Sequence, residues 1–155
     1  MNENVERGLE SLKLWQRSIT FAKSICSEIL PLLPSDEKYS MTSQLRRSCQ
    51  SVPANIAEGY GRYYYQDNVR FCYIARGSLE ETFSHLKLAY ELDYLDRDIY
   101  SSLCDDIQEI RRILSGYISH LKTSKRGSAE PGADLHIQEA PTGYIVDELT
   151  DLIPD

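Results

Sequence analysis

Polar side chains between residues 44 and 58 recur every three or four positions. In a helix this spacing places them in one stripe along one face. Amides, hydroxyls and charges in such a stripe can hydrogen-bond to a neighbouring helix or to a second copy of the chain. We therefore predict an oligomer interface or an internal polar network, which two later residues of the same motif, Arg76 and Glu80, complete. The candidate residues are Gln44, Arg46, Arg47, Ser51, Asn55, Glu58, Arg76 and Glu80.

The arginines between residues 46 and 76 suggest a second chemistry, because four tyrosines crowd the middle of this segment at positions 60 and 63–65. Arginine can bind phosphate through two hydrogen bonds, and aromatic rings can stack on unpaired bases. A nucleic-acid surface would comprise Arg46, Arg47, Arg62, Tyr63, Tyr64 and Arg70. We favour the structural alternative, in which Arg46 or Arg76 pairs with Glu58 and Glu80 inside the bundle or across a subunit contact, and the tyrosines anchor a subunit interface.

Residues typical of catalysis or metal binding are present but are not grouped. The three histidines lie on three separate segments, and no glycine-rich phosphate loop or nucleophile elbow occurs. The four cysteines, at positions 26, 49, 72 and 104, lack the spacing of a zinc site or of a disulfide framework. The sequence predicts a protein that is not an enzyme and has no cofactor.

Charge divides the chain into two parts. Residues 1–126 contain 17 Lys+Arg and 17 Asp+Glu, whereas residues 127–155 contain the other 7 acids and no base, which gives the net charge of −7. A neutral body argues against strong nonspecific nucleic-acid binding, which needs a basic surface. Glycine, serine and proline accumulate after residue 123. We predict a folded unit at 1–123 and a flexible acidic tail at 124–155.

The tail also contains large apolar residues between its acids, especially in residues 135–154. Such residues are uncommon in a purely solvating tail, so the segment could bind a protein partner as a short amphipathic helix or as an added strand. The alternative is an acidic tail that only aids solubility. The candidate contact residues are Tyr144, Ile145, Val146, Leu149, Leu152 and Ile153.

Four helices would position these residues, because apolar side chains before residue 123 recur at helical spacing. The stripes are Leu12, Trp15, Ile19, Ala22, Cys26, Ile29 and Leu33; Leu45, Cys49, Val52 and Ile56; Phe71, Cys72, Ala75, Leu79, Phe83, Leu86 and Tyr90; and Ile99, Leu103, Ile107, Ile110, Leu114, Tyr117 and Leu121. Helices of this length with short connections pack antiparallel. The predicted fold is an all-α, up-down four-helix bundle.

Local signals refine these helices. Ser11, Thr42 and Asp96 are candidate N-caps of the first, second and fourth helices. Pro53 should kink or split the second helix, and a glycine inside the third helix, Gly77, suggests a close crossing with a neighbour.

Several strings within these helices resemble the 23S rRNA intervening-sequence protein family, whose members are also called four-helix bundle proteins. They are T-S-Q-L-R-R at 42–47, S-V-P-A-N-I-A-E-G-Y-G-R at 51–62 and I-A-R-G-S-L-E-E at 74–81, with L-K-L-W-Q at 12–16 and D-Y-L at 93–95. The resemblance covers about residues 9–123.

The resemblance implies an antiparallel bundle that assembles into a ring-like homo-oligomer, typically a pentamer. Members are encoded in bacterial rRNA insertions or as separate genes, and no catalytic activity is established for them. A related branch, the accessory variability determinants of diversity-generating retroelements, binds a reverse transcriptase and nucleic acid through a basic surface. The neutral body of this chain departs from that branch.

These observations predict a non-catalytic structural or adaptor protein that forms a homo-oligomer and presents its tail to a protein partner. The alternative is an accessory factor that binds RNA or a reverse transcriptase. No apolar run is long enough to span a membrane, and the N-terminus lacks the features of a signal peptide, so we expect a cytoplasmic protein that does not bind membranes.

Overall fold

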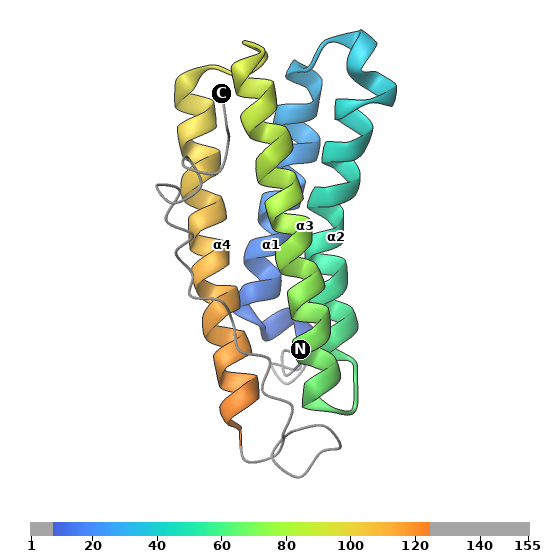
Figure 1. Cartoon of the computed structure of the whole chain (residues 1–155), viewed down its shortest axis with the longest axis vertical. Helices are drawn as coiled ribbons and strands as arrows, with labels where there is room; N and C mark the ends of the chain where they lie inside the picture. Colours follow the sequence, from blue (N-terminus) through green and yellow to red (C-terminus); the bar gives the residue numbers. More distant parts are fainter. Residues whose placement is uncertain (1–7, 125–155) are drawn as a thin grey trace, which may run out of the picture.

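Four long α-helices lie side by side in the computed structural model, which describes residues 8–124 (Figure 1). They are α1 (Lys13–Ser24), α2 (Met41–Tyr60), α3 (Tyr65–Glu91) and α4 (Arg97–Thr123). Successive helices run in opposite directions along the long axis of the molecule. No strand occurs among residues 8–124, and the predicted all-α, up-down bundle is confirmed.

Short helical turns flank α1 and lead into α2. One precedes α1 at Leu9–Ser11, and the chain continues beyond α1 as a π-helical turn at Ile25–Ile29 and a 3-10 turn at Leu30–Leu32. Another 3-10 turn, Ser35–Tyr39, precedes α2. The first helical segment therefore ends at Leu32, two residues before Pro34.

The N-terminal end of α4 has the predicted cap. The side chain of Asp96 accepts a hydrogen bond from the backbone N–H of Ile99 at 2.8 Å, which satisfies one of the unpaired donors at a helix start. The prediction for α1 is wrong, because Leu12 occupies the N-cap position. Ser11 instead donates to the carbonyl of Gly8 within the preceding turn.

The start of α2 also differs from the prediction, since Ser40 rather than Thr42 is the N-cap residue. The capping acceptor comes from the turn before the helix: the Glu37 carboxylate accepts hydrogen bonds from the Met41 N–H at 3.3 Å and from the Ser40 hydroxyl. Together these hydrogen bonds lower the pKa of Glu37. The carboxylate also holds Tyr94, which donates to it at 3.2 Å from the turn between α3 and α4.

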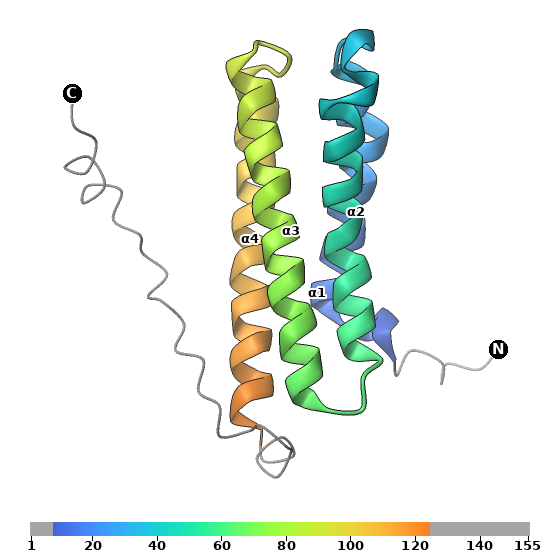
Figure 2. The same cartoon turned by 45° about the vertical axis from the view of Figure 1, so that its right-hand side comes forward.

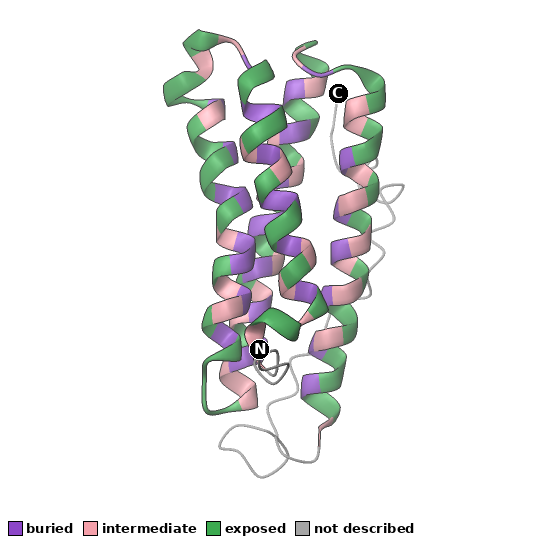
Figure 3. Cartoon of the chain, turned by 180° about the vertical axis from the view of Figure 1, so that it is seen from behind, coloured by how far each residue is buried: buried purple, intermediate pink, exposed green. Residues whose placement is uncertain are grey.

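Buried residues follow the inner faces of the helices (Figure 3). The stripe predicted for α2, namely Leu45, Cys49, Val52 and Ile56, is completely buried. On α3 and α4 most of the predicted apolar positions are buried, and Val69, Ala89 and Ile118 join them. α2 and α3 make the most extensive contact of the bundle.

The stripe predicted for the first helical segment is buried only in part: Ala22, Ile29 and Leu33 are buried, and Leu12, Trp15 and Cys26 are partly buried and pack against the core. Leu14 and Phe21 of α1 and Ile25 of the following π-helical turn lie outside that stripe and are more deeply buried, with exposures of 1%, 3% and 0%. Two members of the predicted stripe lie toward its edge, Trp15 being half-buried and Ile19 40% exposed. The segment therefore has two adjacent apolar faces. The core contacts both of them, but it buries the face of Leu14, Phe21 and Ile25 more deeply than that of Trp15 and Ile19.

The close helix crossing lies at Gly59 rather than at the predicted Gly77. A Cβ added to Gly59 would lie 2.7 Å from Oδ1 of Asn68 and 2.9 Å from Cβ of Phe71, both on α3. Gly77 is exposed, and a Cβ there would meet nothing within 4 Å among residues 8–124. Only a residue without a side chain fits at Gly59.

Pro53 does not split α2, which remains one helix from Met41 to Tyr60. The turn that follows α3 closes with Asp93, whose φ of 59° lies in the left-handed region. Its N–H donates to Tyr90, and the next N–H, of Tyr94, donates to Ala89. This pattern is a Schellman motif, in which the backbone satisfies the last helical carbonyls.

No helix within residues 8–124 combines the length and hydrophobicity needed to cross a bilayer.

Candidate functional site

An apolar groove runs along the outer surface between α1 and α2. It has a volume of about 560 Å³ and is lined by Trp15, Ile19, Ala22, Lys23, Cys26, Gln50, Pro53, Ala54 and Ala57. Lys23 and Gln50 are the polar members of this lining. We call this feature the α1–α2 groove.

The groove exists because its two helices present side chains of different size. On the α2 side, Pro53, Ala54 and Ala57 are small and leave space above the helix backbone. On the α1 side, Trp15 and Ile19 form a wall, since the core face of the helix points elsewhere. Partly exposed apolar side chains around a groove are typical of interaction surfaces.

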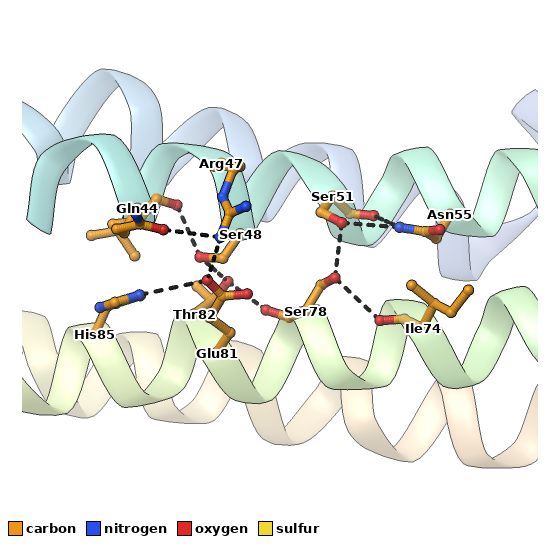
Figure 4. A network of polar contacts seen from close by, with 11 residues as sticks. Gln44, Arg47, Ser48, Ser51, Asn55, Ile74, Ser78, Glu81, Thr82 and His85 are labelled. Atoms are coloured by element: carbon orange, nitrogen blue, oxygen red, sulfur yellow. Dashed lines mark hydrogen bonds and ion pairs between the residues drawn. The ribbon is translucent and has the colours of Figure 1, made fainter. Parts of the chain in front are cut away.

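A row of hydroxyl pairs fills the opposite face of α2, where it meets α3 (Figure 4). Ser51 and Ser78 hydrogen-bond through their hydroxyls at 2.8 Å, and Thr82 donates to Ser48 at 3.0 Å. Asn55 donates to the hydroxyl of Ser51 at 2.9 Å and to its carbonyl at 2.8 Å. We call this row the α2–α3 seam.

Charged side chains lie at the end of the seam nearest the start of α2, where it is exposed to solvent. Arg47 donates to Oε1 of Gln44 at 3.0 Å and pairs with Glu81 at 3.3 Å. His85 lies 3.8 Å from the same Glu81 oxygen. Of the residues predicted for a polar network, Gln44, Arg47, Ser51 and Asn55 therefore lie together between α2 and α3.

The other residues of that prediction are placed elsewhere. Glu58 pairs with Arg62, one turn further along the chain, and Glu80 forms a two-pronged ion pair with Arg111 of α4, its Oε1 lying 2.7 Å from Nε. The guanidinium of Arg76 lies over the ring of Tyr73, 4.8 Å from its centroid. Arg46 is exposed. Within the single chain, Glu58 and Glu80 therefore pair with Arg62 and Arg111, and pairing of Arg46 or Arg76 with them across a subunit contact stays a prediction.

The residues predicted to contact nucleic acid form two groups. Arg62, Tyr63, Tyr64 and Arg70 lie around the turn between α2 and α3, where Tyr63 is 90% exposed and packs edge-on against Tyr64. Arg46 and Arg47 lie near the other end of α2. At 1.5 Å per residue the two groups are about 20 Å apart along the helix.

Burial, rather than a charged partner, dominates the pKa shifts of the thiols. It raises the pKa of Cys72 to about 12, and burial together with the adjacent Cys26 raises the pKa of Cys49 to about 12. Burial also raises the pKa of Tyr117, whose hydroxyl accepts a hydrogen bond from Asn68 at 3.0 Å. Such thiols are protonated at neutral pH and are weak nucleophiles.

Within residues 8–124, no group of three or more histidine, cysteine or acidic side chains is arranged to hold a metal ion. The predicted partner-binding residues of the tail, from Tyr144 to Ile153, lie outside the described residues.

The α1–α2 groove itself is a feature that the sequence interpretation missed. Gln50, Pro53, Ala54 and Ala57 follow the i, i+3, i+4, i+7 spacing of one helix face. That face is small and mostly apolar, and it lies beside the polar and the buried faces of α2. The spacing could have indicated a groove, but alanines on a helix face more often have no role in binding.

Comparisons with known proteins identify a family whose members resemble most of the bundle. The family described as 23S rRNA-intervening sequence protein matches residues 10–116. A crystal structure of a protein with unknown function from the S23 ribosomal protein family of Bacteroides thetaiotaomicron VPI-5482 is 29% identical, with a TM-score of 0.63. The match covers 68% of this chain and 95% of that chain. Among the curated proteins, none matches.

Proposed function

This chain belongs to the 23S rRNA-intervening sequence protein family, and from that premise we propose that it is a non-catalytic structural or adaptor protein. Its copies assemble through the α1–α2 groove into a ring-like homo-oligomer of five subunits. The ring presents several copies of the C-terminal tail to a protein partner.

The observation that carries this proposal is the apolar surface of the groove. Trp15 is half-buried and Ile19 is 40% exposed in the single chain. Burying apolar surface stabilises an assembly by about 25 cal/mol for each Å². A rigid pair of helices already holds these side chains in place, so covering them orders little additional structure. The α2–α3 seam, in contrast, has its hydrogen bonds satisfied within the chain.

A ring of five needs a second surface on each subunit, because its head-to-tail interface joins two different patches of the same chain. Tyr63 and Tyr64 are suited to this role. They are 90% and 43% exposed, and their rings pack edge-on with centroids 5.0 Å apart. Tyrosine is enriched at interfaces because it combines a large apolar ring with a hydroxyl. In the proposed ring this tyrosine pair enters the groove of the neighbouring subunit.

The tail supplies the second half of the proposal. Residues 127–155 contain 7 acids and no base, with large apolar residues between them. In a cyclic assembly every copy of the tail is equivalent, and several weak contacts to one partner act together. The partner surface would combine basic and apolar residues.

The mass of the assembly in solution tests the groove. We expect the full chain to be a pentamer by light scattering and the Ile19→Lys variant to be monomeric, since a charge would enter the apolar contact. Ile74→Lys is a matched control, because Ile74 on α3 is 51% exposed and lies outside the groove lining. The control should remain pentameric.

A monomeric full chain, or an Ile19→Lys variant that still assembles, would contradict the proposal. A variant that ends at residue 126 tests assembly and partner binding separately. It should assemble normally and fail to capture the partner in a pull-down, whereas unchanged capture would remove the adaptor role.

One observation favours the alternative, an accessory factor that binds RNA or a reverse transcriptase. Arg62 and Arg70 lie beside the exposed Tyr63 and Tyr64, so cations and stacking rings occupy one end of the bundle. RNA affinity should then fall steeply with salt concentration, because each neutralised phosphate releases counterions. An absence of RNA binding at low salt would exclude this alternative. The relation to the accessory variability determinants stays a prediction.

A further inference from the structure

Two cysteines meet behind the α1–α2 groove. The sulfur of Cys26, in the π-helical turn Ile25–Ile29, lies 4.0 Å from the sulfur of Cys49 on α2. Both thiols are free. The two residues are 23 positions apart in the sequence, so the contact joins two different helical segments.

The two thiols differ in their access to solvent. Cys26 is half-buried and lines the groove, where the side-chain amide of Gln50 lies 3.9 Å from its sulfur. Cys49 is completely buried, and its thiol donates to the carbonyl of Arg46 at 3.2 Å. A small molecule in the groove can therefore reach Cys26 first, and can reach Cys49 only through it.

The backbone around Cys26 is irregular at the same place. The π-helical turn interrupts the regular hydrogen bonding between α1 and the following 3-10 turn. Such turns are rare and often coincide with functional positions. A disulfide requires the sulfurs to approach to about 2.05 Å, and an irregular turn allows that displacement with less disruption than a regular helix.

From this geometry we infer that Cys26 and Cys49 are an oxidation site, at which a hydroperoxide closes an intramolecular disulfide beside the α1–α2 groove. The pair is a dithiol in the reduced protein and carries one cross-link in the oxidised protein.

The reaction has two steps. In the first, the Cys26 sulfur attacks the terminal oxygen of the hydroperoxide, the O–O bond breaks, and the other oxygen leaves as water or an alcohol after taking a proton. Cys26 is then a sulfenic acid. In the second step the Cys49 sulfur attacks the Cys26 sulfur and the S–O bond breaks. The leaving hydroxide takes the Cys49 proton and departs as water, so two thiols are oxidised for each hydroperoxide reduced.

The environment of Cys49 sets the slower step. Burial and the neighbouring Cys26 raise the pKa of Cys49 to about 12, and the thiolate is the attacking form. Burial, the largest cause of that shift, remains when Cys26 is oxidised, so the closing step should become faster as the pH rises. At neutral pH the sulfenic acid on Cys26 should persist long enough to be trapped.

The other two cysteines serve as internal references. Cys72 is completely buried, and its thiol lies 3.5 Å from Oδ1 of Asn68. Cys104 is half-buried like Cys26, but its neighbour is the hydroxyl of Tyr100 rather than a second thiol. Cys104 therefore matches Cys26 in exposure and lacks a partner sulfur.

The oxidation chemistry does not depend on the proposed assembly, although the two are linked if the proposed function is correct. A neighbouring subunit in the groove would cover Cys26, so oxidation should be faster in the monomeric Ile19→Lys variant than in the assembled protein. Equal rates would count against assembly through the groove and would leave the disulfide itself intact.

The test uses the full chain, reduced and then exposed to hydrogen peroxide before the remaining thiols are alkylated. We expect intact mass spectrometry to show the loss of two hydrogen atoms, which dithiothreitol restores. Peptide mapping should find a Cys26–Cys49 cross-link, with Cys72 and Cys104 alkylated. In the Cys49→Ser variant a dimedone adduct should accumulate on Cys26, and Cys104→Ser should react like the unmodified sequence.

Two results would overturn the inference. One is an oxidised protein in which Cys26 and Cys49 are still separately alkylated. The other is a disulfide that joins two chains or involves Cys72 or Cys104. Circular dichroism of each variant shows whether it keeps the helical fold, and Cys49→Ala in place of Cys49→Ser keeps the test available if the serine variant unfolds.

Discussion

The α2–α3 seam and the α1–α2 groove both depend on small residues of α2, but the seam is closed by hydrogen bonds and the groove is open. Toward α3, Ser48 and Ser51 pair their hydroxyls with Thr82 and Ser78. Toward α1, the small residues are alanines that face the ring of Trp15 across an open groove. Figure 2 shows α2 beside α3 on one side and in front of α1 on the other.

The difference teaches which surface remains available for binding. A small polar residue allows close approach and then requires a partner hydroxyl, so the seam is closed within the chain. A small apolar residue allows close approach without that requirement, so the groove can accept a second molecule. The following experiments test this contrast, from the largest expected effect to the smallest.

Closing the Cys26–Cys49 disulfide should have the largest effect on stability. A cross-link over 23 residues restricts the unfolded chain and should raise the unfolding free energy by about 3 kcal/mol. Chemical denaturation of the oxidised and reduced chains measures the difference. The link joins the π-helical turn after α1 to α2, and the gain should disappear in the Cys26→Ser variant, which cannot form it.

Replacing glycines by alanine compares the close contact of α2 with α3 at Gly59 and the open surface at Gly77. Gly59→Ala should destabilise the chain by about 2 kcal/mol, because the new Cβ would lie 2.7 Å from Oδ1 of Asn68. Gly77→Ala should stabilise it by up to about 1 kcal/mol, since alanine is the better helix former. Thermal unfolding of both variants gives the comparison, and equal signs would contradict the close crossing at Gly59.

Exchanging hydroxyls compares the seam with the groove directly. Ser48→Ala should cost about 1 kcal/mol, because it removes the 3.0 Å hydrogen bond between the buried Thr82 and Ser48 hydroxyls, while the Ser78 carbonyl remains 2.8 Å from the Thr82 hydroxyl. Ala54→Ser, at an exposed position of the groove, should change stability by less than about 0.5 kcal/mol. Denaturation in the monomeric Ile19→Lys background keeps assembly out of both measurements.

Acid titration should show the smallest effect, at the N-terminal end of α2 that both contacts share. The pKa of Glu37 is lowered from 4.5 by hydrogen bonds from Ser40 and Met41. Its stabilising contribution is therefore complete above the unfolded value and is lost as the pH falls through the lower folded value. Glu37→Gln should reduce the loss of stability below about pH 4.5. An unchanged acid profile would show that the cap contributes nothing.

The sequence predicts the bundle because most helices carry one unambiguous apolar stripe. The stripe of Leu45, Cys49, Val52 and Ile56 is completely buried, and the Asp96 cap of α4 is formed as expected. The first helical segment is the exception, since a second apolar series, Leu14, Phe21 and Ile25, lies beside the predicted stripe that begins at Leu12 and is more deeply buried. Periodicity alone cannot decide which of two adjacent apolar faces points inward.

The candidate site was predictable only in part for a related reason. The polar residues from Gln44 to Asn55 mark the seam in the sequence, but their partners on α3 depend on the register of two helices. Gly77 illustrates the same limit, because a glycine in a helix shows that space is permitted and not that it is used. The close approach at Gly59 depends on Asn68 and Phe71, which only the fold brings there.

An even number of antiparallel helices returns the chain to the end from which it started, so the beginning of α1 and the end of α4 share one pole of the bundle (Figure 1). A fluorophore or an affinity matrix attached near residue 8 or residue 124 would crowd that pole and the tyrosine pair beside it. A label on the turn at Asp93 would occupy the opposite pole. The position at which a label is attached therefore decides which end of the bundle stays accessible.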